Sequence, residues 1–117
     1  MRAGGLRQIM LGLNGALEYL GTIDASTSGK SQGTASSTFT IPSGAIVLLQ
    51  SDASAYFVQT LTSDGKLTAS GSAQTTAAML QLDVAPSGFY TVMTDGRQYL
   101  WVRSASGTAN VKVFQVR

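Results

Sequence analysis

The chain contains no cysteine and no histidine. Without cysteine it can form neither a disulfide nor a thiolate metal site, and it has no cysteine nucleophile. Without histidine it lacks the base of the Ser-His-Asp triads. Charged residues make up only 12% of the 117 residues, about half of the usual share. We therefore expect a protein that is not an enzyme and that binds no cofactor and no metal.

The few charged residues form no basic patch. Eight lysines and arginines stand against six acidic residues, and they are scattered singly along the chain. Proteins that track phosphates cluster such residues, so we expect no specific nucleic-acid partner. No stretch approaches the roughly 18 apolar residues that a membrane-spanning helix needs. The sequence predicts a soluble protein that is made in the cytoplasm and does not bind a membrane.

Small residues dominate the composition instead. Alanine (14), serine (14), threonine (13) and glycine (13) fill nearly half of the chain, while 44% of all residues are apolar. Disordered chains lack this apolar content, so the chain is expected to fold. A surface with little charge does not keep copies apart. The composition therefore favours a protein that packs against other subunits.

Short apolar stretches alternate with turn residues over residues 38–117. Residues 45–50 (AIVLLQ) are apolar on both faces, as in a central strand. Turn signals such as Asp64-Gly65 and Asp95-Gly96 recur along the chain. The pattern predicts an all-β domain of about eight short strands, a small antiparallel β-sandwich or barrel of jelly-roll-like or Ig-like type. The expected strands are 39–41, 45–50, 56–61, 66–69, 80–84, 89–94, 97–103 and 108–116.

Residues 1–37 are predicted to form an N-terminal arm or hairpin followed by a loop. Apolar residues of the arm recur at helical spacing, but Asn14-Gly15 is a strong signal for a two-residue hairpin turn, and we favour the hairpin over the helix. Small polar residues in the loop 24–37 can bury no face. A neighbouring subunit would hold such a loop in place. The arm residues that we assign to an interface are Leu6, Ile9, Leu13 and Leu17.

The segment 89–103 carries the strongest aromatic pattern. A turn at Asp95-Gly96 would pair residue 92 with 99 and residue 90 with 101, which leaves both faces of the hairpin apolar. Aromatic pairs beside an arginine are typical of protein interfaces, of sugar-stacking platforms and of ordinary wide cores. The sequence leaves these three interpretations open. The residues that we assign to an interface here are Tyr90, Val92, Tyr99, Trp101 and Arg103.

Residues 41–59 (IPSGAIVLLQSDASAYFVQ) and 100–117 (LWVRSASGTANVKVFQVR) resemble small structural proteins of tailed-bacteriophage virions. The resemblance is one of sequence style and includes no invariant motif. It implies a capsid decoration (cement) protein, located in the virion. Such a protein binds the major capsid protein or other virion proteins, stabilises the assembled head, and forms a homo-oligomer, a trimer or a dimer.

The sequence is also compatible with two other functions. A neck, tail or fibre-associated β-module would bind host-surface glycan through the aromatic residues of the hairpin. An OB-like domain would use the same aromatics to stack single-stranded nucleic acid, but it would also need a basic groove.

Overall fold

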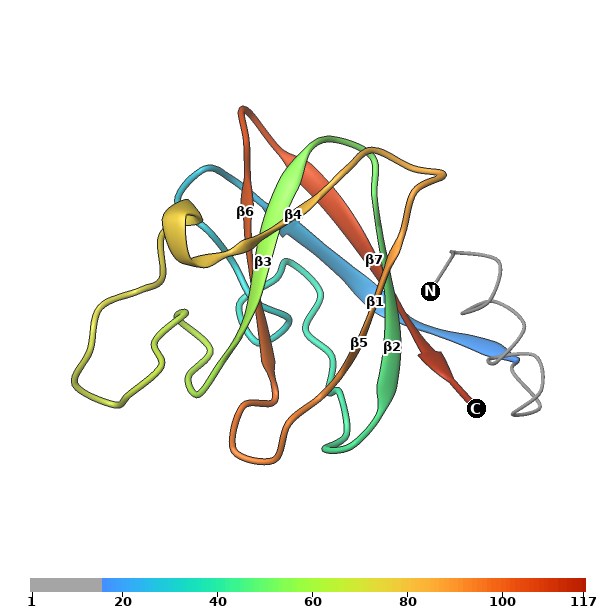
Figure 1. Ribbon diagram of the computed structural model, residues 1–117, viewed down its shortest axis with the longest axis horizontal. Coiled ribbons are helices and arrows are strands. Elements are labelled where there is room, and N and C mark those ends of the chain that lie inside the picture. Colours follow the sequence, from blue (N-terminus) through green and yellow to red (C-terminus); the bar gives the residue numbers. More distant parts are fainter. Residues whose placement is uncertain (1–15) are drawn as a thin grey trace.

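The computed structural model describes residues 16–117, which form two antiparallel sheets packed against each other (Figure 1). One sheet has four strands in the order β1-β7-β2-β5, and the other has three in the order β4-β3-β6. The architecture confirms the predicted all-β fold as a small β-sandwich. The elements are β1 (Leu17–Ala25), β2 (Ile46–Ser51), β3 (Ala55–Thr60), the 3₁₀ turn η1 (Thr76–Ala78), β4 (Leu80–Leu82), β5 (Phe89–Val92), β6 (Tyr99–Ser104) and β7 (Ala109–Val116).

Most of the predicted strands form, and two do not. Strand β2 lies between β7 and β5, as its two apolar faces indicated. The prediction for 66–69 is wrong, because Lys66 forms only an isolated bridge with Ala73. The prediction for 39–41 is also wrong. There Ile41 is buried and Phe39 packs against the core, so these two alternating side chains anchor a loop that is not a strand.

The first described element is an edge strand of the sandwich. Leu17–Ala25 pairs with β7 along its length, with a bulge between Tyr19 and Gly21. The helical alternative is therefore wrong for this stretch, and the strand belongs to the sandwich rather than to a separate arm. Gly21 is required here because a Cβ atom at this position would lie 2.2 Å from the Phe39 ring. Residues 1–15, with the candidate turn and the interface residues Leu6, Ile9 and Leu13, lie outside the described residues.

The polar loop after β1 is held by its own chain. Lys30 exchanges two backbone hydrogen bonds with Val102, at 2.8 and 2.7 Å. The buried Gln32 side chain donates from Nε2 to the carbonyl of Gln98 (2.6 Å), and its Oε1 accepts from the amide of Leu100 (2.8 Å). Buried polar groups thus replace the apolar contacts that the loop lacks. These contacts hold the loop within its own chain, and contact with a neighbouring subunit stays a prediction.

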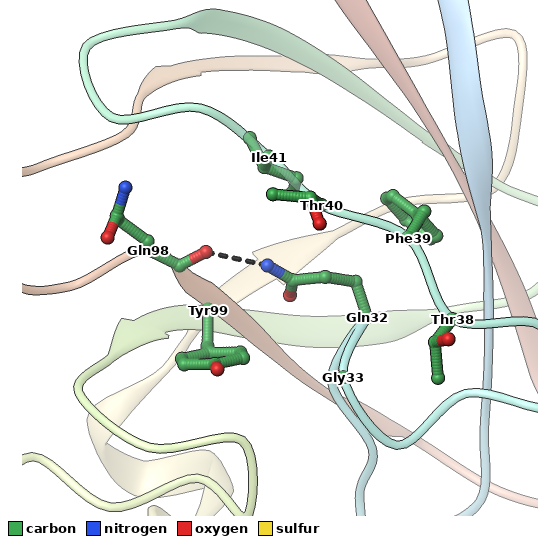
Figure 2. Close-up of a pocket in the computed structure, with 8 residues that line it drawn as sticks. All are labelled: Gln32, Gly33, Thr38, Phe39, Thr40, Ile41, Gln98 and Tyr99. Atoms are coloured by element: carbon green, nitrogen blue, oxygen red, sulfur yellow. Dashed lines mark hydrogen bonds between the residues drawn. The ribbon is translucent and has the colours of Figure 1, made fainter.

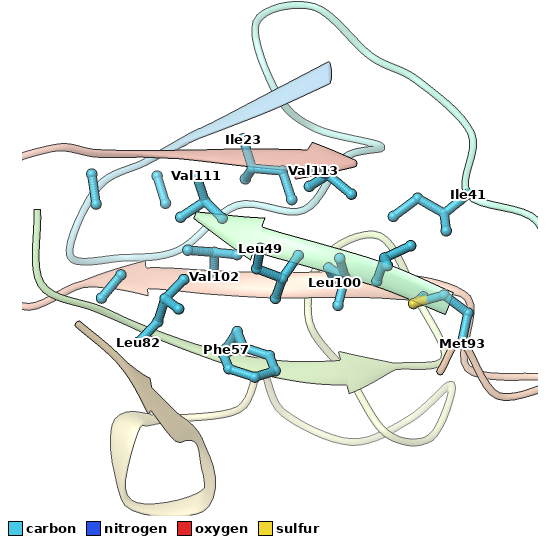
Figure 3. Close-up of a cluster of buried hydrophobic side chains, with 14 of the residues drawn as sticks. Ile23, Ile41, Leu49, Phe57, Leu82, Met93, Leu100, Val102, Val111 and Val113 are labelled. Carbon is cyan, nitrogen blue, oxygen red and sulfur yellow. The ribbon is translucent and has the colours of Figure 1, made fainter. Parts of the chain in front are cut away.

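A single apolar core fills the space between the sheets (Figure 3). Both sheets contribute to it, and the Phe57 ring meets the Phe89 ring edge-on at 4.9 Å. Gln59 adds a polar link, because its side chain donates to the hydroxyl of Thr91 and the carbonyl of Val92, both at 2.8 Å. The fully buried large side chains of the core are Phe57, Ile23, Ile41, Leu49, Leu82, Met93, Leu100, Val47, Val102, Val111 and Val113.

Asp24, near the end of β1, attaches the loop 24–37 to the four-stranded sheet. Its carboxylate accepts hydrogen bonds from the hydroxyl and the amide of Ser36 and lies 3.4 Å from the ammonium of Lys30. The Ser36 hydrogen bonds, aided by Lys30, lower the pKa of Asp24 from 3.8 to about 2. A carboxyl group whose pKa is lowered in the fold stabilises the fold at pH values above its ordinary pKa. This contribution is lost as the pH falls from the ordinary pKa to the lowered one.

Replacing Asp24 with asparagine should therefore remove a pH-dependent part of the stability. We expect Asp24→Asn to be less stable than the wild type near neutral pH, with the difference shrinking as the pH falls from 3.8 towards 2. Urea unfolding at a series of pH values measures this difference. Asp83→Asn is the matched control, since the described part of the structure shows no hydrogen bond to the Asp83 side chain. A difference that does not change with pH would contradict the prediction.

Candidate interaction face and binding pocket

The turn at Asp95-Gly96 forms as predicted, but the hairpin does not continue beyond it. Thr94 and Arg97 form an isolated bridge, and Gly96 has a φ of +80°. Strand β5 then pairs with β2, whereas β6 pairs with β3 in the other sheet. The predicted pairing of 92 with 99 and of 90 with 101 is therefore wrong. Each strand gains a full-length partner and directs apolar side chains into the common core.

Trp101 and Arg103 lie on the outer side of the three-stranded sheet beneath a loop. The Trp101 side chain is only 5% exposed, and its Nε1 donates to the carbonyl of Gln74 at 3.1 Å. Arg103 donates from Nε to the same carbonyl at 2.8 Å, and its guanidinium lies 5.9 Å from the centre of the Trp101 ring. The loop at Gly65 and the turn at Gly29 cover the indole closely, because a Cβ atom at either glycine would lie 2.3 Å from it. The Trp101 ring thus offers no open face for stacking.

Leu17, Tyr90 and Val92 fall together on the outer side of the four-stranded sheet, although they are far apart in sequence. The registers place eight large apolar residues there in two rows across the strands, and we call this set the outer face. Tyr19 and Phe114 of the first row are in contact, with ring centres 5.7 Å apart. The first row is Tyr19, Phe114, Leu48 and Tyr90, and the second is Leu17, Val116, Ile46 and Val92.

The outer face is exposed mainly at its two edge strands. Leu17 and Tyr19 on β1 are 46% and 56% exposed, and Val92 on β5 is 54% exposed. Leu48 in the middle is only 5% exposed; Phe114 and Tyr90 lie beside it on the neighbouring strands, and Gly88 packs against its side chain. No charged residue belongs to the set. Exposed apolar patches of this kind mark surfaces that bind other molecules.

Beyond the outer face, the residues on this side of the four-stranded sheet are polar. The next paired residues are Thr22 with Lys112, and Lys112 with Gln50. Further along, Asp52 accepts hydrogen bonds from the amide and the side chain of Asn110, at 2.8 and 2.9 Å. These hydrogen bonds lower the pKa of the Asp52 carboxyl. The outer face therefore ends at a polar border, as the rim of an interface does.

Five residues of the outer face were missed by the sequence analysis: Tyr19, Ile46, Leu48, Phe114 and Val116. Phe114 and Val116 alternate with Gln115, which was a detectable signal for a common face. The sequence does not indicate which strands are neighbours. The sharing of one face by residues near 18, 47, 91 and 115 therefore could not be deduced.

Tyr99, the remaining predicted residue, lines a pocket rather than the outer face (Figure 2). The pocket has a volume of about 360 Å³, and it is formed by the segment 38–41, by Gln32 and Gly33, and by Gln98 and Tyr99. Gln32 lies between the two walls and is hydrogen-bonded to the backbone of Gln98. None of the lining residues is charged.

Residues 16–117 contain no group of three or more acidic residues placed to hold a metal ion. The only helical element in the same range is the short 3₁₀ turn η1, and no helix there is long and apolar enough to cross a membrane.

Comparison with known proteins adds no relative, since no protein family, no curated protein and no solved structure matches this chain. Functional inference therefore rests on the residues and on their arrangement in the fold.

Proposed function

We propose that the protein is a non-enzymatic structural component of a bacteriophage virion, of the capsid decoration (cement) type. It binds the assembled head through its outer face and stabilises the shell. Its partners are the major capsid protein or other virion proteins, and neighbouring copies in a trimer or dimer. The sequence style of residues 41–59 and 100–117 supports this class of protein, and so does the composition of small, uncharged residues.

The observation that carries the proposal is the outer face. Eight apolar side chains lie together on one side of a sheet whose other side already packs on the core. An antiparallel sheet in an isolated sandwich normally presents polar residues to water on its outer side. Covering the patch by another protein removes apolar surface from water, at about 25 cal/mol for each Å² buried.

The second candidate, a neck, tail or fibre-associated module, would attach through the same face at another position on the particle and would in addition bind host-surface glycan. The sugar-stacking platform that we considered from the sequence is not favoured, because Trp101 is buried and hydrogen-bonded within its own chain. The same burial argues against single-strand stacking on this residue.

A single charge on the outer face tests the attachment surface. Val92→Asp should fold, because Val92 is 54% exposed, but it should bind particles at least about tenfold more weakly, since an unpaired charge would be buried on contact. Particles that lack the protein are mixed with the purified variant, and the bound fraction is measured by sedimentation.

Val84→Asp is the matched control, because Val84 is 47% exposed and does not belong to the outer face. It should bind as the wild type does. If Val92→Asp bound as tightly as the wild type, the outer face would not be the attachment surface. Particles should also release DNA at a lower temperature without the protein than with it, and unchanged particle stability would contradict the stabilising role.

A further inference from the structure

The pocket beside Tyr99 has fixed walls. Gln32 links the loop to β6 through hydrogen bonds to the backbone of Gln98 and Leu100, and its own carbonyl accepts from the amide of Phe39 at 3.3 Å. Gly33 packs directly on the Tyr99 ring, because a Cβ atom at Gly33 would lie 2.9 Å from that ring. These contacts hold the ring and the facing segment in place before any ligand binds, which lowers the entropic cost of binding.

The polar groups of the pocket are neutral, and several are free to bind a ligand. Thr38 and Thr40 bring hydroxyl groups from one wall, and Gln98 brings a carboxamide from the other (Figure 2). The described part of the structure shows no hydrogen bond from these three side chains or from the Tyr99 hydroxyl. Together they can both donate and accept hydrogen bonds.

The absence of charge in the lining restricts the ligand. A phosphate, a carboxylate or a metal ion would leave its charge unpaired in this pocket. The half-buried Phe39 side chain lies beside the hydroxyl groups, Ile41 is buried in the core, and the Tyr99 ring lies across Gln32 from this segment. A saccharide ring combines an apolar face with hydroxyl groups at its edge, and an aromatic ring with a polar tip complements both.

We propose that this pocket binds one ring of a neutral saccharide, with the Tyr99 ring against the apolar face of the sugar and with Thr38, Thr40 and Gln98 bonded to its hydroxyl groups. The volume of about 360 Å³ lies near the lower end of the range for ligand pockets, about 300–1,000 Å³. It therefore suits a single sugar ring. The inference is independent of the outer face and holds whatever partner that face binds.

NMR titration of the full chain with neutral sugars tests the proposal. The probes are glucose, galactose, mannose and N-acetylglucosamine, each raised to millimolar concentration. At least one of them should shift the backbone amide signals of Gln32, Gly33 and Tyr99 in a saturable manner. Glucuronate, which keeps the ring of glucose and adds a carboxylate, should leave these signals unchanged.

Variants separate binding in the pocket from general changes in the protein. Thr40→Val keeps the shape of the side chain and removes one hydroxyl, and it should weaken the affinity about tenfold. Tyr99→Phe keeps the ring and its packing, so it should bind with a smaller loss. Thr108→Val in the β6–β7 turn is the control and should bind as the wild type does. The proposal is overturned if no sugar shifts the three signals, or if Thr40→Val binds as tightly as Thr108→Val.

Discussion

Replacing Trp101 with alanine should lower the free energy of unfolding by about 3–5 kcal/mol. The Trp101 side chain is only 5% exposed, and the loop at Gly65 and the turn at Gly29 pack directly on its indole. Both glycines have positive φ values, +86° and +96°, so these segments are shaped to approach the ring. Removing the ring leaves a cavity and also frees the carbonyl of Gln74 from one of its donors.

Urea unfolding followed by circular dichroism measures this loss, because Trp101 is the only tryptophan and its fluorescence disappears with it. Trp101→Phe keeps a ring but removes the Nε1 hydrogen bond, and we expect it to cost about 1–2 kcal/mol. Tyr19→Ala is the control for an aromatic residue that is 56% exposed, and it should cost less than about 1 kcal/mol in the isolated chain. A loss below about 1 kcal/mol for Trp101→Ala would mean that the indole is not held as described.

The second large effect is expected at Gln32. Gln32→Leu keeps a side chain of similar length but leaves the amide of Leu100 and the carbonyl of Gln98 without their partner. A buried polar group that loses its hydrogen bond costs about 1–3 kcal/mol, so the two together should cost about 2–6 kcal/mol. The loop 24–37 would also lose one of its attachments to β6, while the two backbone hydrogen bonds between Lys30 and Val102 remain.

Two measurements test the role of Gln32. Urea unfolding gives the total loss, and hydrogen exchange should show a Leu100 amide that exchanges faster than in the wild type. Gln81→Leu is the matched control, because Gln81 is exposed on β4 and should tolerate the same change with a loss below about 0.5 kcal/mol. If Gln32→Leu were as stable as Gln81→Leu, the loop would have to be held by other contacts.

The local features of the fold were predictable from the sequence. The β class, the central position of residues 45–50 and the two-residue turn at Asp95-Gly96 follow from side-chain period and turn chemistry. These signals arise from residues that are close together in the chain.

The pairing of strands was not predictable in the same way. The segments before and after Asp95-Gly96 would satisfy a hairpin locally, but each finds a longer partner in β2 or β3. For the same reason the four aromatic residues of that segment lie in four places: Phe89 against Phe57 between the sheets, Tyr90 on the outer face, Tyr99 in the pocket and Trp101 on the covered side of the other sheet.

The attachment of the loop 24–37 was not predictable for a different reason. Its small polar residues suggested weak attachment, because apolar content is the usual sign of burial. Two buried polar residues, Ser31 and Gln32, fix it instead. A buried glutamine cannot be recognised from a single sequence, since its burial depends on backbone groups brought to it from about 70 residues further along.

The position of β7 bears on how the protein reaches its folded state. This strand is the seventh along the chain, yet it lies between β1 and β2 in the four-stranded sheet. During synthesis, β1 has no partner in this sheet until Ala109–Val116 leaves the ribosome, and β2 can pair only with β5. Closing such a distant contact is slow compared with forming a local hairpin. Until then the apolar side chains of β1 stay in water and one edge of β2 stays unpaired, so the nascent chain is most exposed to aggregation in this interval.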